Sequence, residues 1–177
     1  MTSRVAMIRG EAAAPAGGPA RTVAIRADMD ALPVPETTGL PFASENPGVS
    51  HACGHDGHIA MLLGAAAILM RERRRLPGSV KLIFQHAEEK APGGAIELVR
   101  AGVTKGVSAI VGLHVMNGPV GEISVATGPA ASTTSDCAWI EVTGCGAHAS
   151  MPDTGIDPVI DRLGDRHGAS HEASRAQ

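Results

Sequence analysis

The stretch HDGHIAMLLGAAAILMRERRRLPGSVKLIFQ, residues 55–85, contains the pattern that decides the fold. Residues 55–75 are apolar on nearly every face of a helix and end in basic side chains, which suit the negative end of a helix dipole. We therefore predict a buried helix there, with an anion-binding patch at the three arginines as the alternative interpretation of that end. The Pro-Gly pair at 77–78 ends the helix, and residues 79–85 predict a strand.

Further segments on both sides of this stretch continue the pattern. We predict strands over residues 22–27, 109–114 and 122–126 and a helix over residues 94–102. Strands that alternate with helices are typical of a mostly parallel sheet with helices on its faces, so the predicted fold class is α/β. Residues 32–54 form an irregular connection long enough to indicate a functional role.

The composition argues against several classes of protein. Of the 177 residues, 44% are hydrophobic and 19% charged, so we do not expect a disordered chain. Aromatic residues are only 2% and the net charge is -3, so nucleic acid is not an expected partner. The longest apolar run, residues 59–70, is shorter than the roughly 20 residues that a membrane span needs. With no signal-peptide pattern at the N-terminus, we expect a cytoplasmic protein with reduced cysteines.

The densest group of reactive side chains is HACGHDGH, residues 51–58. Its three imidazoles, one thiol and one carboxylate are the donors that Zn, Mn, Co or Ni bind. The start of the predicted helix would help to hold the thiolate and the carboxylate, because backbone N–H groups and the dipole favour anions there. A redox-sensing thiol at Cys53 is a weaker alternative, since no second cysteine lies nearby to resolve an oxidised form.

Acidic or histidine side chains also follow three predicted strands. They are Asp28 and Asp30, then Glu88 and Glu89, and finally His114. Taken singly, the glutamates could belong to a solvated loop and the histidine to a core. The carboxyl ends of parallel strands meet at one edge of a sheet, however, so we expect these residues to converge with the Cys-His cluster. Several such ligands plus one unbound carboxylate are what a dinuclear metal site requires.

Five motifs carry a family resemblance. They are RADMDALP at 26–33, SHACGHDGHIAMLLGAA at 50–66, FQHAEE at 84–89, GLHV at 112–115 and GAHASMPDTGIDPVI at 146–160. In this order they resemble the metal-dependent amidohydrolases that include hippurate hydrolase, N-acyl-amino-acid deacylases and indole-acetyl-amino-acid hydrolases. The resemblance covers roughly residues 20–161 and implies hydrolysis of the amide bond of a small N-acyl amino acid, such as a hippurate-like substrate.

The resemblance also implies roles for individual residues. The implied ligands of two divalent metal ions (Zn, Mn, Co or Ni) are Cys53, His55, Glu89 and His114. Glu88 would be the general acid/base, and Asp30 a second acid of the catalytic domain, behind the ligands. His148 would contact the substrate or the oxyanion from a smaller lid domain, in a homodimer often across the subunit interface.

Domain boundaries follow from the same comparison. We expect a catalytic α/β domain over residues 1–128 that lacks the N-terminal helical segment and the C-terminal part of such enzymes. Residues 129–161 would begin an α+β lid and dimerisation domain with a strand over 135–143, and residues 162–177 a disordered or frameshifted tail, since they have no apolar stripe. The alternative function is therefore a truncated, inactive remnant that keeps part of the metal site and shows little hydrolysis.

Overall fold

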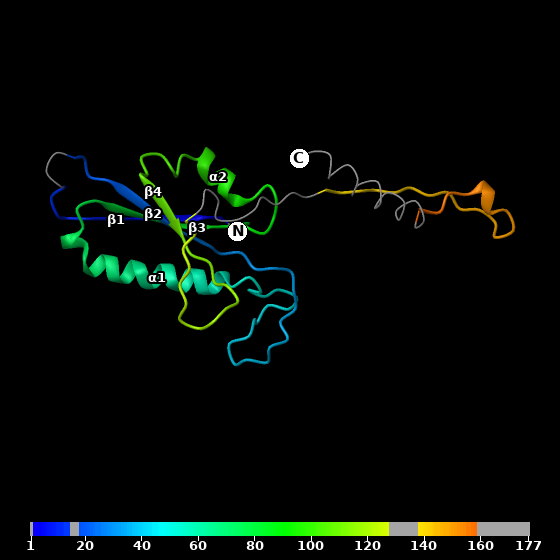
Figure 1. Ribbon diagram of the computed structural model, residues 1–177, viewed down its shortest axis with the longest axis horizontal. Helices are drawn as coiled ribbons and strands as arrows, with labels where there is room; N and C mark the ends of the chain where they lie inside the picture. Colours follow the sequence, from blue (N-terminus) through cyan, green and yellow to red (C-terminus); the bar gives the residue numbers. More distant parts are fainter. Residues whose placement is uncertain (1, 15–17, 128–137, 159–177) are drawn as a thin grey trace. The chain divides into compact units, whose positions relative to one another are not determined.

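A computed structural model describes residues 2–14, 18–127 and 138–158 of the chain. It divides into two compact units, Met1–Val125 and Ala126–Gln177, which are described separately. The first unit contains a four-stranded sheet with one helix on each face (Figure 1). Its main elements are β1 (Arg4–Arg9), β2 (Thr22–Asp28), α1 (His55–Arg71), β3 (Ser79–Gln85), α2 (Gly94–Arg100) and β4 (Ala109–Gly112). The predicted α/β fold class is confirmed.

The strand order of the sheet is β1-β3-β2-β4. Strand β2 runs parallel to both β3 and β4, so each crossover carries one helix: α1 joins β2 to β3, and α2 joins β3 to β4. Strand β1 is antiparallel to β3 and was not among the predicted strands. Its residues RVAMIR leave only Ile8 buried, and a short edge strand of this kind is defined by its partner rather than by its own pattern.

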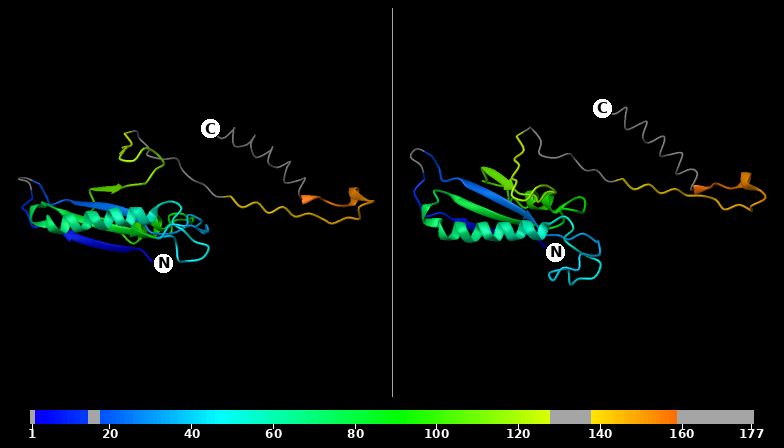
Figure 2. Two further views of the ribbon diagram at one scale, coloured as in Figure 1. Left: turned by 90° about the horizontal axis from the view of Figure 1, so that it is seen from below. Right: turned by 60° about the horizontal axis from the view of Figure 1, so that its bottom comes forward.

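Side chains on one face of the sheet pack against α1, which lies along the strands (Figure 2). Leu62 of α1 meets Ile8, Ala27 and Leu82 there, one residue from each of three strands. The opposite face lies towards α2, where Ile83 and Leu98 line a cavity of about 350 Å³. Successive side chains of a strand point to opposite faces, which explains why Leu82 and Ile83 belong to different layers.

The prediction that the first helix is buried on nearly every face is wrong. In α1 only His55, His58 and Leu62 are buried. Leu63 is 55% exposed and Ile68 is 59% exposed, because within the described residues the sheet covers one side of the helix only.

Several predicted boundaries also differ from the structure. The helix expected over 55–75 ends at Arg71 and is followed by a short 3-10 turn, Arg73–Arg75. The helix expected over 94–102 and the strand expected over 109–114 end two residues early, at Arg100 and Gly112. Residues 122–126 form no strand, because no strand among the described residues supplies them with a ladder of hydrogen bonds.

The described part of the second unit, residues 138–158, contains a 3-10 turn, Pro152–Thr154, and an antiparallel bridge between Cys145 and Ile156. The predicted strand over 135–143 is wrong for residues 138–143, which have no regular structure, and its first three residues lie outside the described ones. The predicted tail, residues 162–177, also lies outside them. Among the described residues, no helix has both the length and the hydrophobicity that crossing a bilayer requires.

Replacing Leu62 with alanine should lower the free energy of unfolding by about 2–5 kcal/mol, because Leu62 is 3% exposed at the centre of the apolar cluster. Denaturant unfolding followed by circular dichroism measures the change. Ile68→Ala is the matched control on the exposed side of the same helix, with an expected change within about 0.5 kcal/mol. Equal losses in the two variants would show that α1 does not pack on the sheet through Leu62.

Candidate metal centre

The pairing of β2 with β3 brings two acidic segments to one edge of the sheet. Asp28 lies opposite Gln85 in the parallel register, so the chain after β2 and the chain after β3 leave the sheet side by side. Asp30 follows the first strand, and Glu88 and Glu89 follow the second. The backbone N–H of Glu89 donates a 3.0 Å hydrogen bond to Asp30 Oδ2, which joins the two segments directly.

His55, the first residue of α1, lies at the centre of this edge and is only 1% exposed. Its Nδ1 is 3.4 Å from Asp30 Oδ1. On the other side of the ring, Nε2 is 3.6 Å from Glu89 Oε1 and 4.0 Å from Glu88 Oε2. Within the described residues, both ring nitrogens and Asp30 Oδ1 are buried without a hydrogen-bond partner.

Cys53 and His114 complete the group around His55. His114 Nδ1 lies 2.6 Å from the carbonyl oxygen of Val115. A carbonyl oxygen can only accept, so Nδ1–H is the donor and the lone pair of a neutral ring is left on Nε2. That atom lies 3.6 Å from Cys53 Sγ. The donor atoms of Cys53, His55 and His114, three of the four predicted ligands, all lie within 4.8 Å of one another. The same holds for His55, the fourth predicted ligand Glu89, and Glu88, which is predicted to be the general acid/base.

A metal cation fits these residues. Buried polar atoms without partners are costly, and here they belong to Asp30 and to His55, whose ring nitrogens lie 3.4–4.0 Å from carboxylate oxygens without a hydrogen bond to any of them. Burial, together with a hydrogen bond to Glu89 and the negative charges nearby, raises the pKa of the Cys53 thiol to about 11. A thiolate at this position therefore needs a neighbouring cation, which a metal ion supplies.

Asp30 is suited to orient His55. Burial raises the pKa of its carboxyl group, but hydrogen bonds from the backbone of Glu89 and Glu88 and the proximity of His55 outweigh burial, so the pKa lies below its usual value. An ionised Asp30 facing Nδ1 would hold the proton of His55 on that nitrogen and leave Nε2 free to bind a metal.

The structure adds an interaction that the sequence analysis missed. Asp28 and His58 are almost completely buried, and Asp28 Oδ1 lies 2.6 Å from His58 Nδ1. Burial raises the pKa of Asp28, yet the hydrogen bond with His58 and the charge of Arg26 bring it below the usual value. The helical spacing could have indicated that His58 lies on the side of α1 that carries His55, because it follows His55 by three residues.

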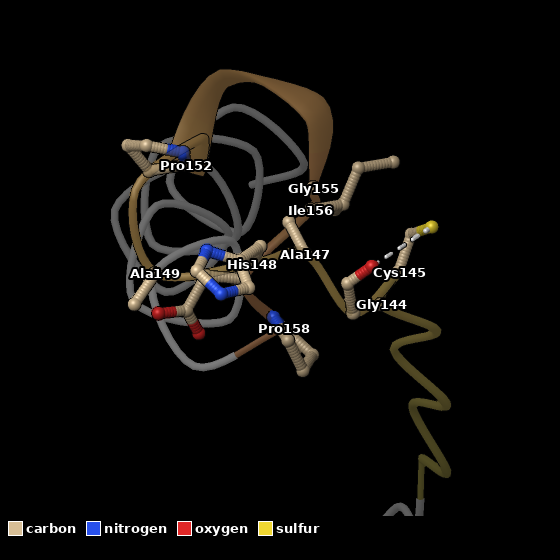
Figure 3. A pocket seen from close by; sticks show the side chains of 11 residues that line it. Gly144, Cys145, Ala147, His148, Ala149, Pro152, Gly155, Ile156 and Pro158 are labelled. Carbon is tan, nitrogen blue, oxygen red and sulfur yellow. Dashed lines mark hydrogen bonds between the residues drawn. The ribbon is translucent and has the colours of Figure 1, made fainter.

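His148 belongs to the second unit. It lines a cavity of about 530 Å³ together with residues on both sides of the Cys145–Ile156 bridge (Figure 3). Its Nδ1 lies 2.8 Å from Ser150 Oγ. The structure therefore brings together six of the seven predicted site residues within the first unit, and places the seventh in the second. The six are Asp30, Cys53, His55, Glu88, Glu89 and His114.

Comparison with known protein families shows the family to which the chain belongs. The model of peptidase family M20/M25/M40 matches residues 24–173, which is most of the chain. The chain belongs to peptidase family M20/M25/M40. The match to this M20/M25/M40 family extends beyond Asp161, where the sequence resemblance was expected to end.

The sequence of this M20/M25/M40 chain is similar to those of several enzymes. It is 50% identical over 80% of its length to an N-acyl-L-amino acid amidohydrolase of Geobacillus stearothermophilus. It is 45% identical over 90% of its length to an N-acetyl-L-cysteine deacetylase of Bacillus subtilis, and 46% identical over 81% to an IAA-amino acid hydrolase ILR1-like 4 of Arabidopsis thaliana. The chain spans 38%, 36% and 32% of the lengths of these three relatives.

Solved structures give the same assignment. The Bacillus subtilis YXEP protein, described as a dinuclear metal binding peptidase from the M20 family, matches with a TM-score of 0.58 and 49% identity. The match covers 64% of this chain and 30% of that protein. An aminohydrolase from methicillin-resistant Staphylococcus aureus matches with a TM-score of 0.58 and 46% identity, over 64% of this chain and 28% of that one.

A hollow of about 460 Å³ lies beside the candidate metal centre of this M20/M25/M40 chain. Asp30 forms part of its wall, so the hollow borders the cluster around His55. The irregular connection after β2 contributes Asn46 and His51, and the segment after β3 contributes Lys90. The hollow therefore combines space for a small molecule with hydrogen-bonding and cationic groups next to the cluster.

Proposed function

We propose that the chain forms the metal site of an amidohydrolase that cleaves the N-acyl bond of N-acyl amino acids, including hippurate-like substrates. The observation that carries the proposal is the buried His55, whose two ring nitrogens lack hydrogen-bond partners among the described residues while thiol, imidazole and carboxylate groups surround it. The names of relatives that are 45–50% identical support the substrate class. A homodimer is the assembly that we propose with it.

The proposed site holds two divalent ions of Zn, Mn, Co or Ni. Its proposed ligands are Cys53, His55, Glu89 and His114. Thiolate and imidazole favour borderline metals over Mg or Ca, which prefer an all-oxygen shell. The description of the YXEP protein as a dinuclear metal binding peptidase supports the number of ions.

The proposed mechanism divides the roles of the two adjacent glutamates. Bound metal ions supply Lewis-acid polarisation of the scissile carbonyl group and lower the pKa of water. Glu88 would accept the proton of the attacking water and donate it to the leaving amine. Its side chain suits this role better than that of Glu89, because it is 41% exposed against 27% and its carboxylate lies farther from His55 Nε2.

Substrate would bind next to this pair. Lys90 and His51 line the hollow beside Asp30 and are suited to attract the carboxylate of an N-acyl amino acid. We also propose that His148 contacts the substrate from the second unit, as the family resemblance implies.

Metal loading of the purified chain tests this function. After removal of metal with a chelator, titration with Zn²⁺, Mn²⁺, Co²⁺ or Ni²⁺ should saturate at two ions per chain, as measured by elemental analysis of the gel-filtered protein. The loaded protein should release amine from hippurate or from N-acetyl amino acids. Failure to retain any metal would refute the site, whereas two bound ions without amine release would favour the inactive remnant.

A further inference from the structure

We propose that Asp28, His58 and the peptide groups of Val115 form a hydrogen-bonded latch that positions His114 at the metal centre. The inference rests on the proposed metal site and assigns Asp28 and His58 as positioning residues, which do not themselves bind the ions. Its basis is a continuous set of contacts from the end of β2, through α1, to the segment that follows β4.

The first half of the latch fixes the tautomer of His58. The backbone N–H of Val115 donates a 3.0 Å hydrogen bond to His58 Nε2, so that nitrogen carries no proton. The proton of a neutral ring is then on Nδ1, from which it is donated to Asp28 Oδ1 over 2.6 Å. The side chains of His58 and Asp28 are each 1% exposed, so water does not compete for the hydrogen bond between them.

The second half of the latch fixes His114. The carbonyl group of the same Val115 accepts the Nδ1–H of His114 at 2.6 Å, and the lone pair on His114 Nε2 lies 3.6 Å from Cys53 Sγ. Val115 thus holds His58 with its N–H and His114 with its carbonyl group. A shift of this residue would move the ligand atom of His114 relative to Cys53.

Packing supports the hydrogen bonds. Gly54, which precedes α1, has a left-handed φ of 76°, and a Cβ at this position would overlap Val115 Cγ2. Val115 therefore sits against the start of α1 where only glycine leaves room for it. The rings of His58 and His114 also meet edge to face, with their centroids 4.6 Å apart.

The anchor of the latch is Asp28. Its second oxygen, Oδ2, accepts a 2.6 Å hydrogen bond from Arg26, and Arg26 Nε donates to Gln85 of β3 at 3.0 Å. The negative charge is thus balanced within the sheet. The nearness of Asp28, His55 and His58 could suggest a further metal site, but both ring nitrogens of His58 already have partners, so His58 has no free ligand atom.

Two amide substitutions of His58 test separately its hydrogen bond with Asp28 and its hydrogen bond with Val115. In His58→Gln the amide oxygen can reach the Nε2 position and accept from Val115, whereas in His58→Asn the amide group can reach only the Nδ1 position beside Asp28. We measure the affinity of the full chain for Co²⁺ by competition with a chromogenic chelator. Loss of a group that orients a metal ligand typically costs about 10–100-fold in metal affinity, so His58→Asn should weaken binding at least tenfold and His58→Gln clearly less.

Leu62→Ala is the control for a general loosening of α1, because it removes apolar contacts one turn beyond His58 but none of the hydrogen bonds of the latch. All variants are compared at a temperature at which circular dichroism shows them folded. Equal Co²⁺ affinities of wild type, His58→Asn and His58→Gln would overturn the latch, and so would an equal loss in Leu62→Ala. If the wild type binds no Co²⁺, the proposed metal site itself is refuted, and the latch with it. If the wild type binds Co²⁺ and the His58 variants bind it equally well, only the latch is refuted.

Nitrogen NMR of the imidazole rings tests the tautomer directly. His58 should show a protonated Nδ1 and an unprotonated Nε2 both before and after addition of Zn²⁺, while the Nε2 signal of His114 should shift on binding. A Zn²⁺-dependent shift of His58 Nε2 to the range of a coordinated nitrogen would make His58 a ligand and overturn the assignment.

Discussion

Replacing Glu88 with glutamine is expected to reduce amide hydrolysis by about 10²–10⁴-fold while the metal content stays near that of the wild type. The amide has nearly the shape of the carboxyl group but cannot carry a proton from water to the leaving amine. The side chain is 41% exposed and its nearer oxygen lies 4.0 Å from His55 Nε2, so its loss should not empty the cluster. Steady-state rates with an N-acyl amino acid and elemental analysis of the same samples measure the two quantities.

Glu89→Gln is the matched control for this variant, because it changes the adjacent residue in the same way. Glu89 is less exposed, and its Oε1 lies 3.6 Å from His55 Nε2, so this variant should lose metal as well as activity. Equal metal loss in both variants would show that the roles of the two glutamates are not divided as we propose.

Replacing Cys53 with serine is expected to weaken metal binding severely, because a hydroxyl group is a far poorer anionic ligand than a thiolate. Cys53 lies beside His114 in the cluster, with its sulfur 3.6 Å from the ring nitrogen. With Co²⁺ as the probe, the thiolate-to-metal absorption band of the wild type should disappear in this variant, and the retained metal should fall.

Cys145→Ser is the control, since Cys145 is exposed and belongs to the second unit. Its metal content and Co²⁺ spectrum should match those of the wild type. We expect the same of Cys137→Ser, although Cys137 lies outside the described residues. Metal analysis that shows no difference among the three variants would remove Cys53 from the site.

The fold class could be predicted from the sequence because it depends on local patterns. The apolar run that becomes α1, the Pro-Gly stop and the strand Ser79–Gln85 are each encoded within a few neighbouring residues. Their alternation with β2 and β4 then leaves few topologies other than a parallel sheet with helical crossovers.

Pairing between distant segments was harder to predict. Strand β1 exists through its antiparallel register with β3, about 75 residues later in the chain, and its own sequence buries only Ile8. Residues 122–126 have a similar local pattern but form no strand. Periodicity describes which side chains can be buried, and only the tertiary structure supplies the partner that buries them.

The sequence by itself determined which side chains gather at the candidate metal centre, because Asp30, Glu89 and His114 follow strands whose carboxyl ends meet at one edge of the sheet. Only the tertiary structure decided how those donors are held. Whether His58 is a ligand or a positioning residue depends on which partner each ring nitrogen meets, and those partners, Asp28 and Val115, are 30 and 57 positions away in the chain. Hydrogen-bond direction is a property of three-dimensional contact, so no spacing in the sequence encodes it.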